Sequence, residues 1–371
     1  MNQKKTALVT GGNGFIGTNL VRMLVASGEY HVVNLDALTY AANPLSLADL
    51  ERHPNYEFAR GNITDRRLAD SLFEKYRPVG VFHLAAETHV DRSIVSADDF
   101  VQTNVIGTYT MLDAARVYWN TLPDELKKEF RFLHVSTDEV FGSLGEEGYF
   151  SEETPYAPQN PYSASKASSD HFVRAFHHTY GLPTIITNCS NNYGPYQFPE
   201  KVIPLMILNA LSGKPLPVYG DGSNVRDWIY VEDHCKAVKL AFEKGRPGEV
   251  YAVGARNEQK NINLVNQVCS VLDEIAPPVE VPHLREQGLK SYAELINFVE
   301  DRPGHDHRYA IDPTKITREL GWQPEVEFEE GLRRTVDWYL SNLKWLDQAS
   351  GGSYGAWIEK NYAWRAKKET K

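Results

Sequence analysis

Thr137, Asp138 and Glu139 are three polar residues that follow an apolar run at 132–136. The run is partly β-branched and predicts a buried parallel strand. Ligands of open α/β sheets bind just beyond the carboxyl ends of the strands, so we expect the acid pair to face a substrate. Two neighbouring carboxyls repel each other when both are ionised, which favours retention of one proton. The pair can therefore supply a general acid beside a general base.

Tyr162 and Lys166 are a second candidate pair, four residues apart behind Asn160-Pro161. A spacing of four places both side chains on one helical face. A nearby ammonium favours the phenolate, so this tyrosine can act as a base near neutral pH. The same spacing also occurs by chance in helices, and the surrounding elements decide between the two interpretations.

A glycine-rich turn follows the predicted strand at 6–10 and leads into an apolar-periodic helix. The glycines fit two spacings, one with Gly12, Gly14 and Gly17 and one with Gly11, Gly14 and Gly17. Either spacing brings backbone N–H groups and a helix N-terminus up to a pyrophosphate. The turn therefore predicts a dinucleotide site.

The next predicted strand, 31–35, ends in Asp36, about 20 residues beyond the glycines, where an acid bonds the adenosine ribose. This carboxylate would repel a 2′-phosphate, so NAD is favoured over NADP. Small residues at Ala85 and Ala86 would let a cofactor lie against another strand end. In this setting we interpret Tyr162 as catalytic. Further strands are predicted at 56–59, 79–84, 131–136, 184–188, 228–231 and 249–253.

The alternation of strands and helices predicts an α/β fold with a Rossmann-type doubly wound parallel sheet. The pattern becomes rich in Pro and Gly after residue 195. We expect an NAD-binding Rossmann domain, a smaller C-terminal α+β substrate domain and a tail. Their boundaries are 1–195 plus 225–255, 196–224 plus 256–347, and 348–371.

Arg226, Asn261, Arg302 and His305 are the candidates in the second part for binding an anionic ligand, because Arg forks match phosphate oxygens. A metal site through His305 and His307 is not favoured, since alternate residues of an extended chain point to opposite faces. We therefore expect no metal.

Glu87, His89, Asp91 and Arg92 follow the strand at 79–84. Such charged residues either face the site or form a solvated loop. For Asp91 and Arg92 we expect the solvated loop.

The composition of the 371 residues, with 42% apolar and 24% charged, is typical of a soluble globular protein. A net charge of -10 with scattered Lys and Arg indicates no nucleic-acid partner. Three unpaired cysteines favour a reducing compartment. No stretch resembles a signal peptide or a membrane span, so we expect a cytoplasmic protein without membrane contact.

These motifs resemble the extended short-chain dehydrogenase/reductase family through residues 10–17 and 162–166. Within it, the chain is most similar to the dTDP-glucose 4,6-dehydratases over roughly residues 5–345. Asn62, Thr88 and Phe141 depart from that family's usual Asp, Ser and Tyr. The stretches that carry the closer resemblance are 38–41, 83–94, 136–142, 188–201, 226–233 and 301–305.

The resemblance implies a redox-neutral dehydration with tightly held NAD. Tyr162 would take the proton of the glucose 4-hydroxyl while C4 gives hydride to NAD, and Thr137 would bond the C4 oxygen. Glu139 would then remove the C5 proton and Asp138 would protonate the departing 6-hydroxyl, before hydride returns to C6. Lys166 would hold the nicotinamide ribose and lower the pKa of Tyr162.

The resemblance also implies the contacts of both ligands, and a homodimer paired through helices of the NAD domain. The cofactor contacts would be Gly11, Gly12, Gly14, Phe15, Ile16, Gly17, Asp36, Leu38, Thr39, Asn62, Ile63, Leu84, Ala85, Ala86, Thr103, Tyr162, Lys166 and Asn191. The nucleotide-sugar contacts would be Thr88, Thr137, Asn191, Glu200, Lys201, Val202, Pro217, Tyr219, Arg226, Asn261, Arg302 and His305.

Two other functions fit parts of this sequence. An NAD-dependent sugar-nucleotide epimerase or decarboxylase does not explain why Asp138 adjoins Glu139. A non-catalytic NAD-binding protein would be expected to lack Tyr162, Lys166 or the acid pair, and all four residues are present. The thymidine base rests on the resemblance at 188–226 alone, so uridine and cytidine stay open.

Overall fold

The computed structural model describes residues 4–301 and 304–350. Arg302 and residues 351–371 of the predicted tail therefore lie outside the described residues. No helix in the described ranges is long and apolar enough to cross a membrane.

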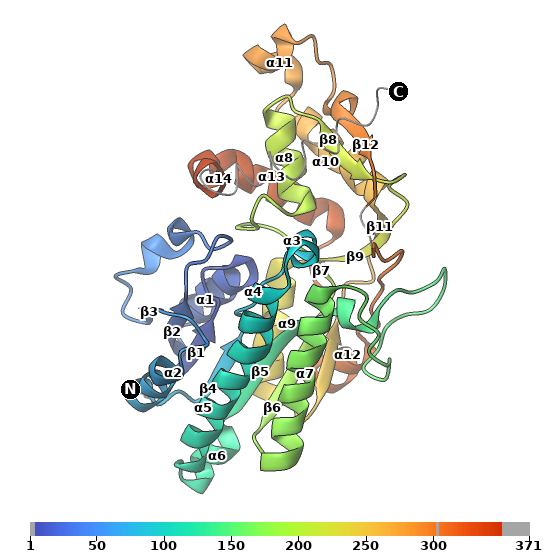
Figure 1. Ribbon diagram of the computed structural model, residues 1–371. Coiled ribbons are helices and arrows are strands. Elements are labelled where there is room, and N and C mark those ends of the chain that lie inside the picture. Colours follow the sequence, from blue (N-terminus) through green and yellow to red (C-terminus); the bar gives the residue numbers. More distant parts are fainter. Residues whose placement is uncertain (1–3, 302–303, 351–371) are drawn as a thin grey trace.

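Parallel strands form the main sheet of the described chain, and they run in the order β10-β6-β5-β4-β1-β2-β3. The order reverses between β1 and β4, which is the point where open α/β sheets form a ligand crevice. The predicted doubly wound sheet is thus confirmed (Figure 1). The strands are β1 (Lys5–Thr10), β2 (Tyr30–Asp36), β3 (Tyr56–Arg60), β4 (Gly80–His83), β5 (Arg131–Thr137), β6 (Thr184–Cys189) and β10 (Val250–Val253).

Helices cover both faces of this sheet because successive strand residues point to opposite sides. Ala7 and Val9 belong to one apolar cluster, whereas Leu8 belongs to another. Since both faces are covered, the strands are near-continuous apolar runs. The first cluster includes α1 (Phe15–Ser27), α9 (Val231–Lys244) and α12 (Thr314–Leu320). The second includes α2 (Arg66–Tyr76), α5 (Thr108–Asn120) and α7 (Pro161–Tyr180).

The start of α7 is fixed by a capping box. The Asn160 side chain accepts a hydrogen bond from the Ser163 N–H at 2.9 Å, and the Ser163 hydroxyl accepts one from the Asn160 N–H at 3.2 Å. Pro161 occupies the first helical position, where its missing N–H has no cost. The box therefore holds Tyr162 in the first turn, one turn before Lys166.

A second group of elements has its own apolar cluster and lies beyond the carboxyl ends of the main sheet (Figure 1). β9 (Val225–Tyr230) pairs with β7 (Asn191–Tyr193) and β11 (Glu258–Lys260), and β8 (Leu216–Tyr219) pairs with β12 (Ile296–Val299). Its helices are α8 (Val202–Leu211), α10 (Asn261–Ile275), α11 (Pro282–Glu286), α13 (Phe328–Ser341) and α14 (Leu343–Ser350).

The chain returns from β9 to the main sheet through α9 and β10, which pairs with β6. β9 itself pairs outside that sheet. The remaining helices are short and lie in the connections. They are α3 (Val90–Val95), α4 (Asp98–Phe100), α6 (Asp124–Glu129), the π-helix Val101–Gly107 and the 3₁₀ helices Pro44–Leu50, Asp138–Phe141, Pro278–Glu280 and Tyr292–Leu295.

Candidate active site

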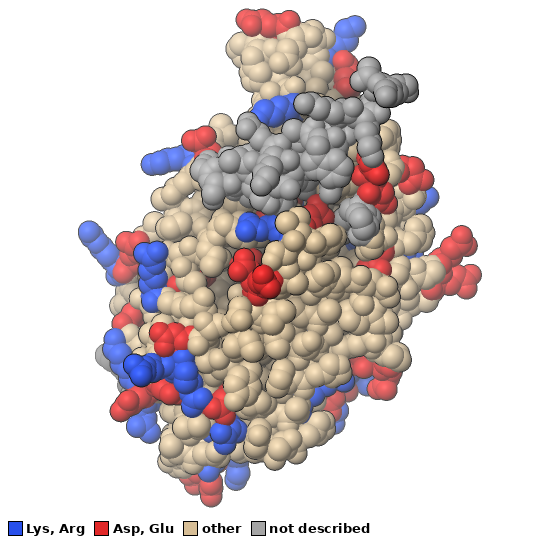
Figure 2. Space-filling view, in the orientation of Figure 1, with Lys and Arg blue, Asp and Glu red and all other residues tan. Residues whose placement is uncertain are grey.

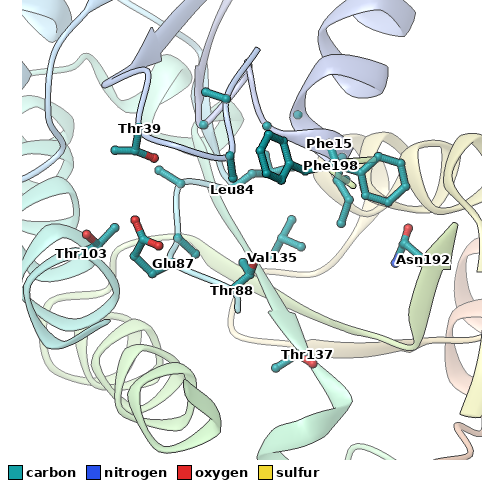
Figure 3. Close-up of a pocket in the computed structure, with 18 of the residues that line it drawn as sticks. Phe15, Thr39, Leu84, Glu87, Thr88, Thr103, Val135, Thr137, Asn192 and Phe198 are labelled. Atoms are coloured by element: carbon teal, nitrogen blue, oxygen red, sulfur yellow. The ribbon is translucent and has the colours of Figure 1, made fainter. Parts of the chain in front are cut away.

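A long pocket follows the carboxyl ends of β1, β2, β4, β5 and β6. In the view of Figure 3, Thr39, Thr103 and Glu87 lie on one side of it and Phe198 and Asn192 on the other. The predicted residues that line it are Gly11, Gly14, Phe15, Ile16, Gly17, Asp36, Thr39, Asn62, Ile63, Leu84, Ala85, Ala86, Thr88, Thr103, Thr137, Asp138, Glu139, Tyr162, Lys166, Asn191, Glu200 and Lys201.

The glycine turn approaches other backbone too closely for larger residues. Gly11 has φ +73°, and a Cβ there would lie 2.7 Å from the backbone of Ala85. A Cβ on Gly17 would lie 2.1 Å from the Gly11 carbonyl oxygen. Gly14 is different, because a Cβ there would meet only that oxygen, at 3.3 Å, and would otherwise project into open space.

Two predicted cofactor residues, Gly12 and Leu38, do not line the pocket. Gly12 packs against Asn34, whose Oδ1 accepts the Gly12 N–H at 3.0 Å. Leu38 contributes its backbone N–H, which donates to Asp36 Oδ1 at 2.8 Å. Of the two glycine spacings, the one beginning at Gly11 faces the pocket.

Asp36 ends β2 and holds the turn with both carboxyl oxygens. Oδ2 accepts the Asn13 N–H at 2.8 Å, and Oδ1 accepts the Leu38 N–H. Burial raises the pKa of Asp36, and these backbone donors oppose that rise. The N-terminus of α1 has no side-chain cap, so its N–H groups can bind a phosphate. An open cradle at Gly14 and an acid at the end of β2 fit a dinucleotide.

Asp138 is buried, and its Oδ2 has no hydrogen-bond partner among the described residues. Burial, followed by the charge of Glu139, raises the pKa of Asp138 well above its ordinary value. Its Oδ1 accepts the Thr137 hydroxyl at 3.2 Å, and that hydroxyl accepts the Glu139 N–H at 3.2 Å. Asp138 can therefore retain a proton and donate it.

Tyr162 is buried, and burial together with the charge of Glu139 raises its pKa well above the ordinary value. Lys166 Nζ donates to the Val135 carbonyl at 2.8 Å and lies 3.3 Å from His134 Nε2. The raised pKa reflects burial and the charge of Glu139, and that Lys166 lowers the pKa of Tyr162 stays a prediction. Burial also lowers the pKa of Lys166 to about 8.

A second pocket adjoins the first and contains most of the predicted substrate residues. Both pockets are lined by Glu139, Asn191, Asn192, Gln197, Glu200 and Lys201, so they share one wall. Arg302 lies outside the described residues, and Thr88 and Thr137 line the first pocket only. The predicted residues in the second pocket are Asn191, Glu200, Lys201, Val202, Pro217, Tyr219, Arg226, Asn261 and His305.

Basic groups of the second pocket are held by neighbouring oxygen atoms. The Arg226 guanidinium donates to the Val225 carbonyl and to the Asp306 carbonyl, both at 2.8 Å. His305 Nδ1 lies 2.6 Å from Asp301 Oδ1. Residues 4–301 and 304–350 contain no group of three or more His, Cys, Asp or Glu that could hold a metal ion.

Glu200 is buried in the shared wall. Burial raises its pKa to about 7. Its Oε1 accepts the Tyr40 hydroxyl at 3.2 Å, and its Oε2 lies 3.7 Å from His89 Nε2. The wall therefore contains a carboxyl that titrates close to neutrality.

The expectation that Asp91 and Arg92 lie in a solvated loop is wrong. Both lie on α3, where Asp91 is 8% exposed and accepts the Tyr219 hydroxyl at 3.0 Å. The Arg92 guanidinium lies 3.7 Å from the centre of the Tyr40 ring. Helical folding turns Asp91 toward the second pocket, and a local charge pattern does not predict that.

Other lining residues were missed within stretches that the resemblance already quoted. Asn192, Gln197 and Phe198 line the first pocket, and they fall within the quoted stretch 188–201 without having been named as contacts. Phe141, one of the departures, stacks on Phe150 with ring centres 5.2 Å apart and lines neither pocket.

Comparison with known proteins places this arrangement in a family. A family profile described as GDP-mannose 4,6 dehydratase matches residues 8–335. A probable dTDP-glucose 4,6-dehydratase of Sinorhizobium fredii is 58% identical over 91% of this chain and 93% of that protein. A dTDP-glucose 4,6-dehydratase of Neisseria meningitidis serogroup B is 56% identical over 94% of this chain and 96% of that protein.

Solved structures agree with the sequence comparison. A dTDP-glucose 4,6-dehydratase of Bacillus anthracis, in complex with NAD, superposes with a TM-score of 0.80 at 43% identity. The match covers 93% of this chain and 99% of that one. With its glycine turn, its acid pair and its Tyr162–Lys166 pair, the chain belongs to the NAD-dependent dTDP-glucose 4,6-dehydratase family.

Proposed function

We propose that this chain dehydrates dTDP-glucose to dTDP-4-keto-6-deoxyglucose. The observation that carries the proposal is the buried Asp138, whose pKa is raised, next to Glu139, which lines both pockets. An elimination of water across C5 and C6 needs a base for the C5 proton and an acid for the departing oxygen. An epimerase needs no such pair.

Tyr162 is the base for the 4-hydroxyl proton, and Thr137 donates a hydrogen bond to the C4 oxygen. NAD supplies hydride acceptance from C4 and hydride return to C6, and its positive ring would favour the phenolate. Glu139 then takes the C5 proton, which the neighbouring C4 ketone acidifies, and returns a proton to C5 when hydride is delivered to C6. Asp138 gives its proton to the C6 oxygen, and water leaves.

The binding residues follow the two pockets. Gly11, Gly14 and the start of α1 would hold the pyrophosphate of NAD, Asp36 would hold its adenosine ribose, and Lys166 would hold its nicotinamide ribose. The nucleotide sugar occupies the second pocket, near Lys201 and the remaining predicted substrate residues. In this division, residues 1–195 with 225–255 form the NAD-binding domain, 196–224 with 256–347 form the substrate domain, and 348–371 are a tail. Two segments depart from these bounds, because β9 with Arg226 lies in the second group of elements and 348–350 end α14.

The chain acts in the cytoplasm as a homodimer in which α5 and α7 face a second copy. Figure 2 shows few charged side chains over these helices. Tyr109 and Phe172 are exposed there, with ring centres 5.9 Å apart. An exposed apolar face of this kind fits a two-fold, self-complementary interface.

The test is incubation with dTDP-glucose in deuterated water, without added NAD, followed by mass spectrometry. The expected product has lost one water and carries one deuterium at C5, because Glu139 exchanges its proton with solvent. A Tyr162→Phe variant serves as the inactive control.

Unchanged substrate would first require the same assay with added NAD, then with UDP-glucose and CDP-glucose. Turnover of only one of these would reassign the nucleotide base. No turnover of any of them would contradict the proposed activity.

A further inference from the structure

Lys166 belongs to a buried cluster beneath the pocket, together with His134 on β5 and Asp170 one turn further along α7. Lys166 Nζ lies 3.3 Å from His134 Nε2, and His134 Nε2 in turn lies 3.2 Å from Asp170 Oδ1. All three side chains are nearly inaccessible to solvent. The imidazole thus stands between a cation and an anion.

The surroundings of Asp170 favour its ionised form. Its Oδ2 accepts the Ser136 hydroxyl at 2.7 Å and the Tyr156 hydroxyl at 2.8 Å. Although burial raises the pKa of Asp170, hydrogen bonds from His134 and Ser136 and the charge of Lys166 bring it below the ordinary value. A buried carboxylate with several donors is stable only when a positive charge is near.

His134 Nε2 can form a hydrogen bond with only one of its two neighbours, Lys166 or Asp170, at a time. When Lys166 is charged, Nε2 accepts its N–H; when Lys166 is neutral, Nε2–H donates to Asp170. Burial and the charge of Lys166 lower the pKa of His134 to about 4, so the ring is neutral while Lys166 is charged. Its tautomer therefore follows the charge on Lys166.

We propose that Asp170 is the buried counter-ion of Lys166 and that His134 connects them, which makes both residues positioning residues for the Tyr162–Lys166 pair. The inference rests on the proposed function. Without the carboxylate, an ammonium in this interior has no compensating charge and loses its proton. A neutral Lys166 amine stabilises the Tyr162 phenolate less than an ammonium does.

Other titratable groups face this cluster from each element around it. Cys189 on β6 faces Lys166, and His83 on β4 stacks on His134 with ring centres 5.3 Å apart. Tyr162 is the neighbour on α7, one turn earlier. Asp138 and Glu139 act on Tyr162 from the turn after β5, and Arg174 donates to Tyr156 at 3.2 Å. Of these, only Asp170 is a carboxylate that contacts the Lys166–His134 pair.

The direct test follows the titration of Lys166 by NMR of ¹³C-labelled lysine, with Lys166→Arg identifying its signal. In Asp170→Asn the titration midpoint should fall by about one pH unit or more. Tyr156→Phe is the matched control, because it removes a hydrogen bond to the same carboxylate and keeps the charge. An equal shift in both variants, or none in Asp170→Asn, would overturn the proposal.

The activity readout is the alkaline limb of kcat/KM against pH. Asp170→Asn should move this limb to lower pH by the same amount, about tenfold in rate per unit at the alkaline end. In a Lys166→Arg background the shift should vanish, because arginine stays charged. A persistent shift there would show that Asp170 acts elsewhere.

If Asp170→Asn fails to fold, two variants of His134 replace it. His134→Gln keeps an acceptor for Lys166 and a donor for Asp170, whereas His134→Leu keeps neither. Only the leucine variant should lower the Lys166 midpoint, and equal midpoints in the two would contradict the proposal. The titration needs no turnover, so failure of the proposed reaction leaves this result interpretable.

Discussion

At the scale of residues, Asp138 and Glu139 are neighbours in different surroundings. Asp138 is buried, and burial with the charge of Glu139 raises its pKa, whereas Glu139 lines both pockets. One chemical type thus supplies two functions, and the environment separates them.

Glu139→Gln should stop the reaction after oxidation at C4. An amide cannot take the C5 proton, so product formation should fall by about 10²–10⁴-fold while reduced nicotinamide accumulates on the protein. Absorbance of the reduced ring and mass spectrometry of the sugar nucleotide measure the two effects. Glu153→Gln, in an exposed loop, is the control. Normal product formation would remove Glu139 from the mechanism.

The stability of Asp138→Asn relative to the parent chain should increase as pH rises. Because the folded state holds the proton of Asp138 more tightly than the unfolded state, the parent chain loses stability as pH rises from the ordinary Asp pKa through the raised one. Asparagine does not titrate, so at high pH the free energy of unfolding of the variant should exceed that of the parent chain by on the order of 1 kcal/mol. Thermal unfolding between about pH 5 and pH 8 tests this. A constant difference in Tm would contradict the raised pKa.

The sequence predicts such residues unequally. The acid pair and the tyrosine–lysine pair follow from their spacing and their place after a strand or at a helix start. His134 lies in an apolar strand and Asp170 on a helix, so neither stands out locally. Only the fold places their side chains 3.2 Å apart.

At the scale of elements, the start of α1 is less stable than a capped helix start but leaves room for a ligand. Gly14, the N-cap residue just before α1, has extended backbone with φ -75° and ψ 176°, and it offers no side-chain cap. Serine would be tolerated there and would favour the helix. Glycine keeps the cradle open instead.

Gly14→Ser and Gly17→Ala should therefore fail in different ways. Gly14→Ser should fold with Tm unchanged or slightly raised but bind NAD about tenfold or more weakly, since its side chain fills the cradle. Gly17→Ala should lose about 1–3 kcal/mol of folding free energy, because its Cβ meets backbone. Calorimetric NAD titration and thermal unfolding separate the effects. Unchanged NAD affinity in Gly14→Ser would place the pyrophosphate elsewhere.

At the scale of the whole molecule, the fold class follows from the sequence because buried strands and amphipathic helices alternate. The pairing of β9 with β7 and β11 does not follow, since its residues resemble those of a main-sheet strand. Likewise, α3 turns Asp91 inward only because the second group of elements offers Tyr219. Long-range contacts decide these points.

The association of two copies gives the prediction at this scale. Tyr109→Glu with Phe172→Glu should convert a dimer to a monomer, because two charges would have to be buried in an apolar interface. Light scattering after size-exclusion chromatography measures the mass. Val279→Glu, at an exposed site distant in the fold, is the control. Dimers of the double variant would move the interface to another face.

The wall that the two pockets share also bears on inhibitor design. Since Glu139, Asn191, Asn192, Gln197, Glu200 and Lys201 line both pockets, the two pockets lie no further apart at this wall than the thickness of one residue. A single compound that joins a weak binder of each pocket through a short linker would bind its second half at high effective concentration. Selectivity over other Rossmann proteins would then come from the sugar-nucleotide half, because the dinucleotide half is common to many of them.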